Sequence, residues 1–332
     1  MTGIIKGTGA YVPQYMLENQ DLEKLVETSD EWIQERTGIQ RRHIAKEDTA
    51  VSMAVKAAAE ALKQAKLTSE QIDMILVSTM SPEKVMPCTA CQVQEKIGAS
   101  HAVCFDLNAA CSGFIMAYAT ACAYIEAGIF QNILVIGSEC LSHVTDWSDR
   151  GTCILFGDGA GAAVVTADRE QQPTIPVLCS DGAKGEALTL NSGQKQNPIF
   201  GTSIKENDSS RFIQMDGQAI FKFAARKVPE AIEEVLQRNR LRKGDIKYYV
   251  LHQANKRIVE AVAKRIGEPA YKFPMNMQEY GNTSSASIPI LLREMQEKNM
   301  LHPGDRLVLA GFGGGLTWGA VIVTWRQGDV AK

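Results

Sequence analysis

The chain has 332 residues, of which 45% are hydrophobic and 22% charged, and its 35 basic and 38 acidic side chains leave a net charge of −3. These values are typical of one large globular domain or two fused ones. The charge balance gives no indication of nucleic-acid or membrane binding. Residues 1–9 lack the pattern of a secretory signal, and no apolar run reaches the roughly 20 residues that span a bilayer. We therefore expect a soluble, cytoplasmic protein.

The 8 cysteines of such a chain are expected to be reduced thiols and not a disulfide framework. Cys88 and Cys91 form a C-x-x-C motif, but a zinc site would need a second pair at similar spacing, which the sequence lacks. A redox pair is the other option, although the motif opens a predicted helix without a thioredoxin-like setting. We interpret these two cysteines as structural.

The N-terminal half predicts alternating strands and helices. Apolar runs predict strands, and apolar residues at helical spacing predict helices. The expected strands cover residues 4–11, 72–79 and 132–137, and the expected helices cover residues 49–67 and 90–97. Such alternation implies a mainly parallel sheet covered by helices on both faces.

Trp32 and Arg36 lie four residues apart in a further predicted helix, and therefore on one helix face. A surface cation–π pair would explain this spacing. A platform that stacks a ligand ring beside a phosphate contact would explain it equally well, and the sequence barely separates the two.

Residues 108–115 form the central segment, with Cys111 in its middle. A short apolar run before it, residues 102–105, predicts a buried strand. The following residues 112–127 carry one charge, Glu126, and predict a helix that is buried on every side and stops at Gly128. Unpaired N–H groups and the helix dipole at Cys111 favour a nucleophilic thiolate. The alternative is a buried structural cysteine, which residue statistics alone would favour.

The glycine-rich residues 150–162 do not make a convincing dinucleotide-binding motif, because a strand and not a helix is predicted after them. We expect these glycines to permit a tight turn beside a packed backbone. Residues 180–211 are polar and predict a long loop of the kind that covers sites. Residues 221–238 predict a helix with Lys222 and Arg226 on a basic face.

An internal repeat indicates the architecture. Strand, helix, functional residue and strand recur in the same order about half a chain apart, with Cys111 and Asn282 as the aligned pair (282 − 111 = 171). Two fused βα halves, residues 1–170 and 171–332, would bury their shared helices in the middle. Cys111, Asn282 and His252 would then meet at strand or helix ends across a pseudo-twofold axis, where parallel sheets bind ligands.

Glycines at the end of another predicted strand, in residues 311–319, would let backbone N–H groups approach a reacting oxygen. An oxyanion hole is the natural use. A plain turn is the alternative, but three successive glycines make a backbone that is costly to order.

Together these motifs resemble the thiolase superfamily, and more narrowly the β-ketoacyl-acyl-carrier-protein synthase III family. The resemblance covers nearly the whole chain. It rests on residues 30–33, 36–39, 108–113, 157–161, 252–255, 281–284 and 312–315. It implies an α/β, thiolase-like fold of two pseudo-symmetric halves in a layered αβαβα arrangement.

The resemblance also implies an activity, the initiating condensation of type II fatty acid synthesis. Cys111 would be acylated by an acyl-CoA primer. His252 and Asn282 would then donate hydrogen bonds to the thioester oxygen of malonyl-acyl-carrier protein as it loses CO2. The carbanion would attack the acyl group, whose oxygen the N–H groups of Cys111 and Gly314 would hold. No metal or resident cofactor is expected, because decarboxylation drives the reaction.

The remaining implied site residues concern binding. Trp32, Arg36 and Arg150 match positions for CoA, with the aromatic ring on adenine and the cations on phosphate. The matching tunnel positions are Thr37, Gly217, Phe221 and Asn255. Lys222, Arg257 and Lys264 would form a basic rim for an acidic carrier protein. Members of the family are homodimers.

Two positions depart from the family pattern. Met86 stands where relatives often have Phe. This side chain is expected to reach the partner subunit's acyl pocket, so the sequence does not define the length and branching of the primer. Gln218 stands where many relatives have Asn, a milder change in the tunnel.

Three other functions compete with this hypothesis. A secondary-metabolism relative or a pure acyltransferase would keep Cys111 without requiring malonyl-acyl-carrier protein. A cysteine hydrolase would need a base beside the cysteine and an open path for water, which nothing in the sequence favours. A non-catalytic scaffold of the same fold should have lost the three residues that this chain keeps.

Overall fold

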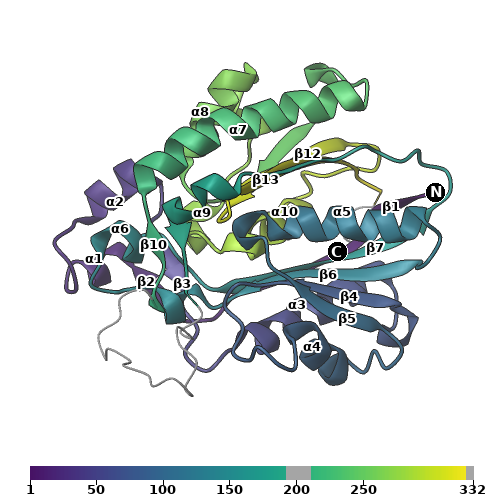
Figure 1. The fold of residues 1–332 in the computed structure, drawn as a ribbon, viewed down its shortest axis with the longest axis horizontal. Helices are drawn as coiled ribbons and strands as arrows, with labels where there is room; N and C mark the ends of the chain where they lie inside the picture. Colours follow the sequence, from purple (N-terminus) through teal and green to yellow (C-terminus); the bar gives the residue numbers. More distant parts are fainter. Residues whose placement is uncertain (192–210, 327–332) are drawn as a thin grey trace.

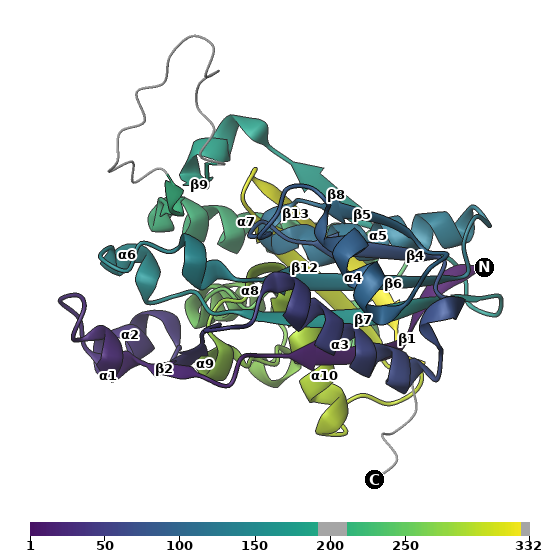
Figure 2. The same ribbon diagram turned by 90° about the horizontal axis from the view of Figure 1, so that it is seen from below.

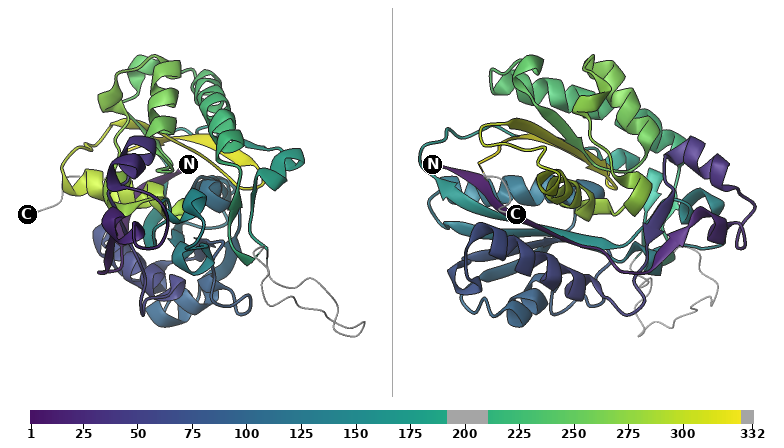
Figure 3. Two further views of the ribbon diagram at one scale, coloured as in Figure 1. Left: turned by 90° about the vertical axis from the view of Figure 1, so that its left-hand side faces the viewer. Right: turned by 180° about the vertical axis from the view of Figure 1, so that it is seen from behind.

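The computed structural model describes residues 1–191 and 211–326. These residues stack as helices, sheet, helices, sheet and helices (Figure 1), which confirms the layered arrangement that we expected. The end-on view in Figure 3 shows the same stacking, with the green α7–α8 layer above and the blue α3–α4 layer below.

The first sheet has the order β1-β7-β6-β4-β5 and uses only strands from the first half of the chain. Its strands are β1 (Thr2–Tyr11), β7 (Gly159–Asp168), β6 (Asn132–Glu139), β4 (Met74–Ser78) and β5 (Val103–Leu107). β4 pairs in parallel with both β5 and β6, whereas β7 is antiparallel to both β1 and β6.

The second sheet has the order β11-β12-β13-β8 and uses only strands from the second half. Its strands are β11 (Tyr248–Leu251), β12 (Arg306–Gly313), β13 (Thr317–Thr324) and β8 (Val177–Ser180). Only β11 and β12 are parallel here. The expectation of a mainly parallel sheet was therefore wrong. Helical crossovers give the parallel pairs around β4 and β11, whereas β12 and β13 are antiparallel because a short connection joins them.

Helices fill the three other layers. Figure 2 shows α3 (Ala50–Ala65) and α4 (Thr89–Ile97) on the outer face of the first sheet. The outer face of the second sheet carries α7 (Gly217–Arg238) and α8 (Lys256–Ile266). The middle layer is α5 (Gly113–Glu126) and α10 (Ser287–Glu297), whose apolar side chains join strands of both sheets in one core cluster. A helix that is apolar on opposite sides can satisfy both sheets at once.

Short elements gather at one end of the layers, on the left in Figure 1. They are β2 (Met16–Glu18), α1 (Asn19–Leu22), α2 (Asp30–Thr37), β3 (Arg41–His43), α6 (Arg150–Cys153), β9 (Leu188–Thr189), β10 (Gln214–Met215) and α9 (Met277–Tyr280). Within the described ranges, none of the helices combines the length and the apolar character that a bilayer crossing demands.

Three local expectations need correction. The strand before Cys111 is not buried, because β5 is the edge of its sheet and Val103 is 49% exposed. The glycines of residues 157–161 lie beside closely packed neighbours, as expected, and a Cβ on Gly161 would lie 2.7 Å from Pro289 Cγ of α10; but Gly159 and Gly161 belong to β7 and not to a turn. α7 begins at Gly217, before the expected start, because the Asp216 carboxylate accepts hydrogen bonds from the first N–H groups. The loop expected at residues 180–211 lies in part outside the described residues.

The repeat is present, but its register differs from the one we inferred. β4 and β11 begin at equivalent points, β6 and β12 begin and end at equivalent points, and both pairs are displaced by the same interval (248 − 74 = 174 and 313 − 139 = 174). At that interval Asn282 corresponds to Asn108 and not to Cys111 (282 − 108 = 174). The aligned pair was wrong by three residues.

Candidate active site

A cavity of about 760 Å³ opens where the two halves meet, at the carboxyl ends of the central strands. Its walls include Cys111 from the first half, and His252, Asn282 and Gly314 from the second. Residues that are far apart in the sequence therefore share one enclosed space.

Cys111 sits in a one-turn 3-10 helix, Ala110–Ser112, that leads into α5. The side chain of Asn108 accepts the Ala110 N–H at 3.1 Å, and Ala110 has a left-handed φ of 46°. This strained turn presents the sulfur to the cavity, although Cys111 is buried. A Cβ on Gly313 would lie 2.6 Å from the Cys111 backbone nitrogen, so only glycine leaves space beside that N–H group.

The resting form of Cys111 is a thiol, contrary to our expectation of a thiolate. Burial raises its pKa from 9.0 to about 12, and the charge of Glu139 acts in the same direction. A hydrogen bond from Ser284 favours the thiolate but does not offset burial. The helix terminus that we relied on is too deeply desolvated to ionise the sulfur at rest.

His252 follows the end of β11 and is fully enclosed. Its Nδ1 lies 2.7 Å from the Ser287 hydroxyl, whose oxygen also accepts the Gln253 N–H at 3.3 Å. Burial lowers the pKa of His252 from 6.5 to about 3, so the ring is neutral at pH 7. A Ser287 O–H donated to Nδ1 would place the proton of the neutral ring on Nε2 and make Nε2 a hydrogen-bond donor.

Asn282 is held between the two halves. Its backbone N–H donates to Leu155 at 2.8 Å, and its carbonyl accepts the Gly157 N–H at 3.1 Å. Its side-chain oxygen accepts the Ser284 N–H at 2.9 Å. With the oxygen engaged in this turn, the amide Nδ2 is the group that the side chain can offer to a molecule in the cavity.

The glycine segment after β12 is tied to the turn that bears Cys111. The Thr317 hydroxyl lies 3.1 Å from the Gly314 carbonyl, 3.2 Å from the Ala109 carbonyl and 2.8 Å from the Ser112 hydroxyl. These contacts fix the backbone of Gly313 and Gly314 against the cysteine turn.

The same cavity collects most of the predicted binding residues. Its lining includes Arg36, Thr37, Gly217, Phe221 and Asn255, together with Gln218 and the exposed cations Lys222 and Arg257. Trp32 and Arg150 do not line it but lie next to Arg36. The guanidinium carbon of Arg150 is 4.9 Å from the Trp32 ring centre, and that of Arg36 is 5.6 Å away. The cation–π arrangement is therefore present in the chain itself.

Other predicted positions lie apart from the cavity. Met86 is 87% exposed on the surface of this chain, and Lys264 lies exposed in the last turn of α8. The sulfurs of Cys88 and Cys91 are 3.4 Å apart at the start of α4. Residues 1–191 and 211–326 contain no cluster of three or more His, Cys, Asp or Glu side chains suited to a metal ion.

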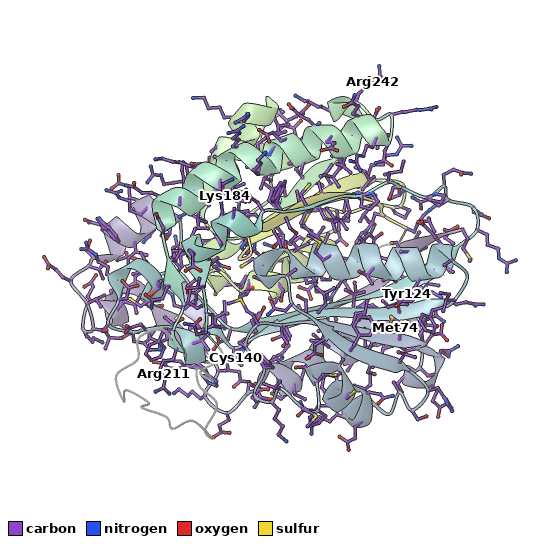
Figure 4. All side chains as sticks on the ribbon, in the orientation of Figure 1. Met74, Tyr124, Cys140, Lys184, Arg211 and Arg242 are labelled. Carbon is purple, nitrogen blue, oxygen red and sulfur yellow. The ribbon has the colours of Figure 1, made fainter. Side chains whose placement is uncertain are left out.

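Three polar residues around Cys111 and His252 were not predicted from the sequence: Glu139, Ser284 and Ser287. Glu139 is the last residue of β6 and lies one residue before Cys140, which is labelled in Figure 4. A carboxylate directly after a buried apolar strand was a signal that could have been used. The two serines gave no signal, because their roles depend on the fold of the second half against the first.

A cysteine, an imidazole and a carboxamide that converge between two similar βα halves define a condensing enzyme of the thiolase type. Two family models, both described as 3-oxoacyl-[acyl-carrier-protein] synthase III, match residues 105–182 and, for its C-terminal part, 236–325. The chain belongs to this family, which is also called β-ketoacyl-acyl-carrier-protein synthase III.

Close relatives support the assignment over nearly the full length. The β-ketoacyl-[acyl-carrier-protein] synthase III of Clostridium novyi is 44% identical over 322 residues, which cover 97% of this chain and 98% of the relative. That of Desulfitobacterium hafniense is 47% identical over 328 residues, 98% of each chain. The crystal structure of the Aquifex aeolicus 3-oxoacyl-[acyl-carrier-protein] synthase III has a TM-score of 0.90 at 43% identity, and the match covers 97% of this chain and all of that one.

Proposed function

We propose that this enzyme starts type II fatty acid synthesis by joining an acyl-CoA primer to malonyl-acyl-carrier protein, with Cys111 as the acyl carrier. The observation that carries the proposal is the convergence of Cys111, His252 and Asn282 on one cavity from both halves. The reaction releases CoA and CO2 and yields 3-oxoacyl-acyl-carrier protein.

In the first step the sulfur of Cys111 attacks the thioester carbonyl of the primer. We assign the CoA moiety to the mouth of the cavity, where its adenine would stack on Trp32 and its phosphates would meet Arg36 and Arg150. The tetrahedral oxygen would be held by the N–H groups of Cys111 and Gly314. The space that Gly313 leaves beside the first of these groups supports this assignment.

In the second step malonyl-acyl-carrier protein loses CO2, and negative charge develops on its thioester oxygen. His252 donates from Nε2 and Asn282 from Nδ2, so two neutral donors stabilise the enolate. A neutral histidine suits this role, because it donates a hydrogen bond without adding a buried positive charge. Tunnel contacts would come from Thr37, Gly217, Phe221 and Asn255.

In the third step the carbanion attacks the acyl group on Cys111 and expels the sulfur. The same two N–H groups stabilise this second tetrahedral oxygen. The loss of CO2 supplies the driving force, so we expect the reaction to need no metal or resident cofactor.

Two partners complete the proposal. An acidic carrier protein would dock on Lys222, Arg257 and Lys264, which are exposed around the mouth and on α8. A second copy of the chain would cover the free edge of β5 and the exposed Met86, which would reach the acyl pocket of its partner. The expected cellular location is the cytoplasm.

Two variants test the division of roles. Cys111→Ser should abolish labelling by acyl-CoA in an intact-mass assay, while Cys104→Ser, a change at a partly exposed cysteine on β5, should not. His252→Ala should leave acylation of Cys111 largely intact and abolish CO2 release from malonyl-acyl-carrier protein. Labelling at another cysteine in Cys111→Ser would reassign the nucleophile. Equal loss of both steps in His252→Ala would refute the separate roles.

A competition assay with straight and branched acyl-CoA primers would then define the primer. The adaptable side chain of Met86 leaves this preference open to measurement.

A further inference from the structure

Two thiols outside the active-site cavity are in direct contact. Cys88 Sγ donates a hydrogen bond to Cys91 Sγ at 3.4 Å, and both side chains are half-buried. Neither residue lines the cavity, and the chemistry proposed for Cys111 uses neither of them. The sequence left a redox role for this C-x-x-C motif as the alternative to a structural one, and the contact between the sulfurs now favours the redox role.

The start of α4 explains why the two sulfurs meet. Cys88 is the N-cap of α4 and has an extended backbone, and Cys91 is the third residue of the helix. Side chains at these two positions lie next to each other, which is why they bond reciprocally in a capping box. Cysteine at both positions therefore brings two thiols together through local structure alone.

Cys88 lies at the boundary between a fixed helix and an exposed segment. The carboxylate of Asp106 on β5 accepts the N–H groups of Thr89 at 2.7 Å and of Ala90 at 2.8 Å, which fixes the start of α4 on the sheet. On the other side of Cys88 the chain is open to solvent, with Val85 92% and Met86 87% exposed. A small reagent can therefore approach the sulfurs from that side.

The surroundings give the two sulfurs different roles. The hydrogen bond with Cys88, together with burial, raises the pKa of Cys91, so Cys91 keeps its proton. Cys88, beside the exposed segment, is then the sulfur that we assign to attack a reagent. A third thiol, Cys104 on β5, donates to the Ala102 carbonyl at 3.5 Å, and burial raises its pKa to about 12. Because only the thiolate exchanges, Cys104 should take no part.

We propose that Cys88 and Cys91 form a thiol–disulfide exchange site, at which a low-molecular-weight disulfide oxidises the two thiols and a thiol reduces them again. In the cytoplasm, where we expect this enzyme, the resting state of such a site is the dithiol and the disulfide is transient.

The exchange balances in atoms and electrons. The Cys88 sulfur loses its proton and attacks one sulfur of the reagent, whose own sulfur–sulfur bond breaks and releases one small thiol that carries this proton. The Cys91 sulfur then attacks Cys88 Sγ, the mixed disulfide breaks, and a second small thiol leaves with the proton of Cys91. The protein loses two electrons and two protons, and the reagent gains them as two thiols.

The disulfide should affect the residue that we assign to the partner subunit's acyl pocket. Bond formation brings the sulfurs from 3.4 Å to about 2.0 Å and ties the residue before α4 to its first turn. Met86 is only two residues before Cys88, so its freedom to move falls when the bond forms. We therefore expect oxidation to change which primers are accepted, and this part of the inference rests on the proposed function.

The site is tested by incubating the whole enzyme with glutathione disulfide and glutathione at several ratios, followed by alkylation, trypsin and mass spectrometry. Trypsin releases residues 85–96 as one peptide, in which Cys88 and Cys91 are the only cysteines. With excess thiol both cysteines should be alkylated. With excess disulfide neither should be, and the peptide should be lighter than the free dithiol by two hydrogen atoms.

Three variants separate the roles of the sulfurs. Cys91→Ser should hold glutathione at Cys88 as a stable mixed disulfide, because no second thiol displaces it. Cys88→Ser should leave Cys91 as a free thiol in every mixture. Cys104→Ser is the matched control, and its peptide should be oxidised as in the wild type.

Primer selection is then compared in the reduced and oxidised wild type, as the ratio of straight to branched acyl groups loaded on Cys111 in competition. This ratio does not depend on how much enzyme is lost by oxidation of Cys111 itself. It should change severalfold, since a pocket separates acyl groups that differ by one methylene by about tenfold or more. Cys88→Ser should give one ratio in both mixtures.

The possible failures are distinguishable. A wild-type peptide that remains fully alkylated in excess disulfide would overturn the exchange site, as would a bond from Cys88 or Cys91 to Cys104. An unchanged primer ratio in enzyme that carries the disulfide would overturn its effect on primer selection. A reduced wild type that is never acylated at Cys111 would instead refute the proposed function, and the peptide result would still decide the exchange site.

Discussion

The turns that precede α5 and α10 have the same backbone conformation but serve different purposes. Each begins with an asparagine, Asn108 or Asn282, whose side-chain oxygen accepts the N–H two residues later. Each continues with a left-handed residue, Ala110 at φ 46° or Ser284 at φ 49°. Each then makes a short 3-10 turn before the central helix starts.

The two turns differ in what the opposite half places against them. Gly313 of β12 lies against the Cys111 N–H and leaves room there, whereas Glu139 of β6, its equivalent at the same interval (313 − 139 = 174), fills the space against Ser285 with a carboxylate. Ser287 bonds His252, whereas at the equivalent Gly113 a side chain would collide with Ser78. The turn at Cys111 thus leaves room for the reacting carbonyl, whereas the equivalent turn before α10 holds the side chains that support the site.

The largest effect is expected when each of the two asparagines is replaced separately by alanine. Asn282→Ala should lower decarboxylation by about 100- to 1,000-fold, because it loses both a donor to the enolate and the turn. Asn108→Ala loses only the turn bond and should cost about 1 kcal/mol of stability with a small change in rate. CO2 release and denaturant unfolding, measured on both proteins, check this. Similar losses in rate would mean that the amide of Asn282 serves the turn alone.

The second test fills the space beside Cys111. Gly313→Ala should reduce acylation about 100-fold, since its methyl group would crowd the N–H that binds the tetrahedral oxygen. Gly314→Ala keeps its own N–H, and its methyl group would meet nothing closer than 3.4 Å, so it should lose much less. Single-turnover acylation of the two proteins gives the comparison. If Gly314→Ala proves the more damaging change, the oxyanion site lies elsewhere.

A smaller effect is expected at the serine that orients the imidazole. Ser287→Ala should slow decarboxylation about tenfold, the value of one neutral hydrogen bond, because Nδ1 then loses its donor and the tautomer is no longer fixed. Acylation should be unaffected. Nitrogen NMR of the labelled ring would report the tautomer directly, and an unchanged Nε2–H population would contradict the assignment.

The smallest expected effect concerns the dependence of the folded protein's stability on pH. The folded pKa of His252 is about 3, below the ordinary 6.5, so the unfolded chain binds this proton more readily. The contribution of His252 to the free energy of unfolding is complete above pH 6.5. It falls by about 1.4 kcal/mol for each pH unit below 6.5, down to the folded pKa. Urea unfolding of wild type and His252→Asn between pH 7 and pH 5 isolates this slope. A constant difference between the two proteins would show that the pKa of the ring is the same in the folded and unfolded states.

The sequence was sufficient for the layers and for most of the cavity. Cys111, His252 and Asn282 carried recognisable local patterns, and the repeat indicated that they could meet. The ionisation state of Cys111 was not predictable, because desolvation depends on what the other half packs over the sulfur. The exposure of β5 was missed for a related reason, since an apolar run does not reveal whether its strand has one neighbour or two. The repeat was misaligned because chemistry, and not backbone shape, was used to pair Cys111 with Asn282.

The middle layer has a consequence for the integrity of the chain. α5 packs on strands of both sheets, and so does α10. A protease that cut the connection between β7 and β8 would therefore leave two fragments that stay associated, and the cleaved enzyme should remain active. The same two fragments, produced separately, would each expose an apolar helix to water and should regain activity only after they are mixed.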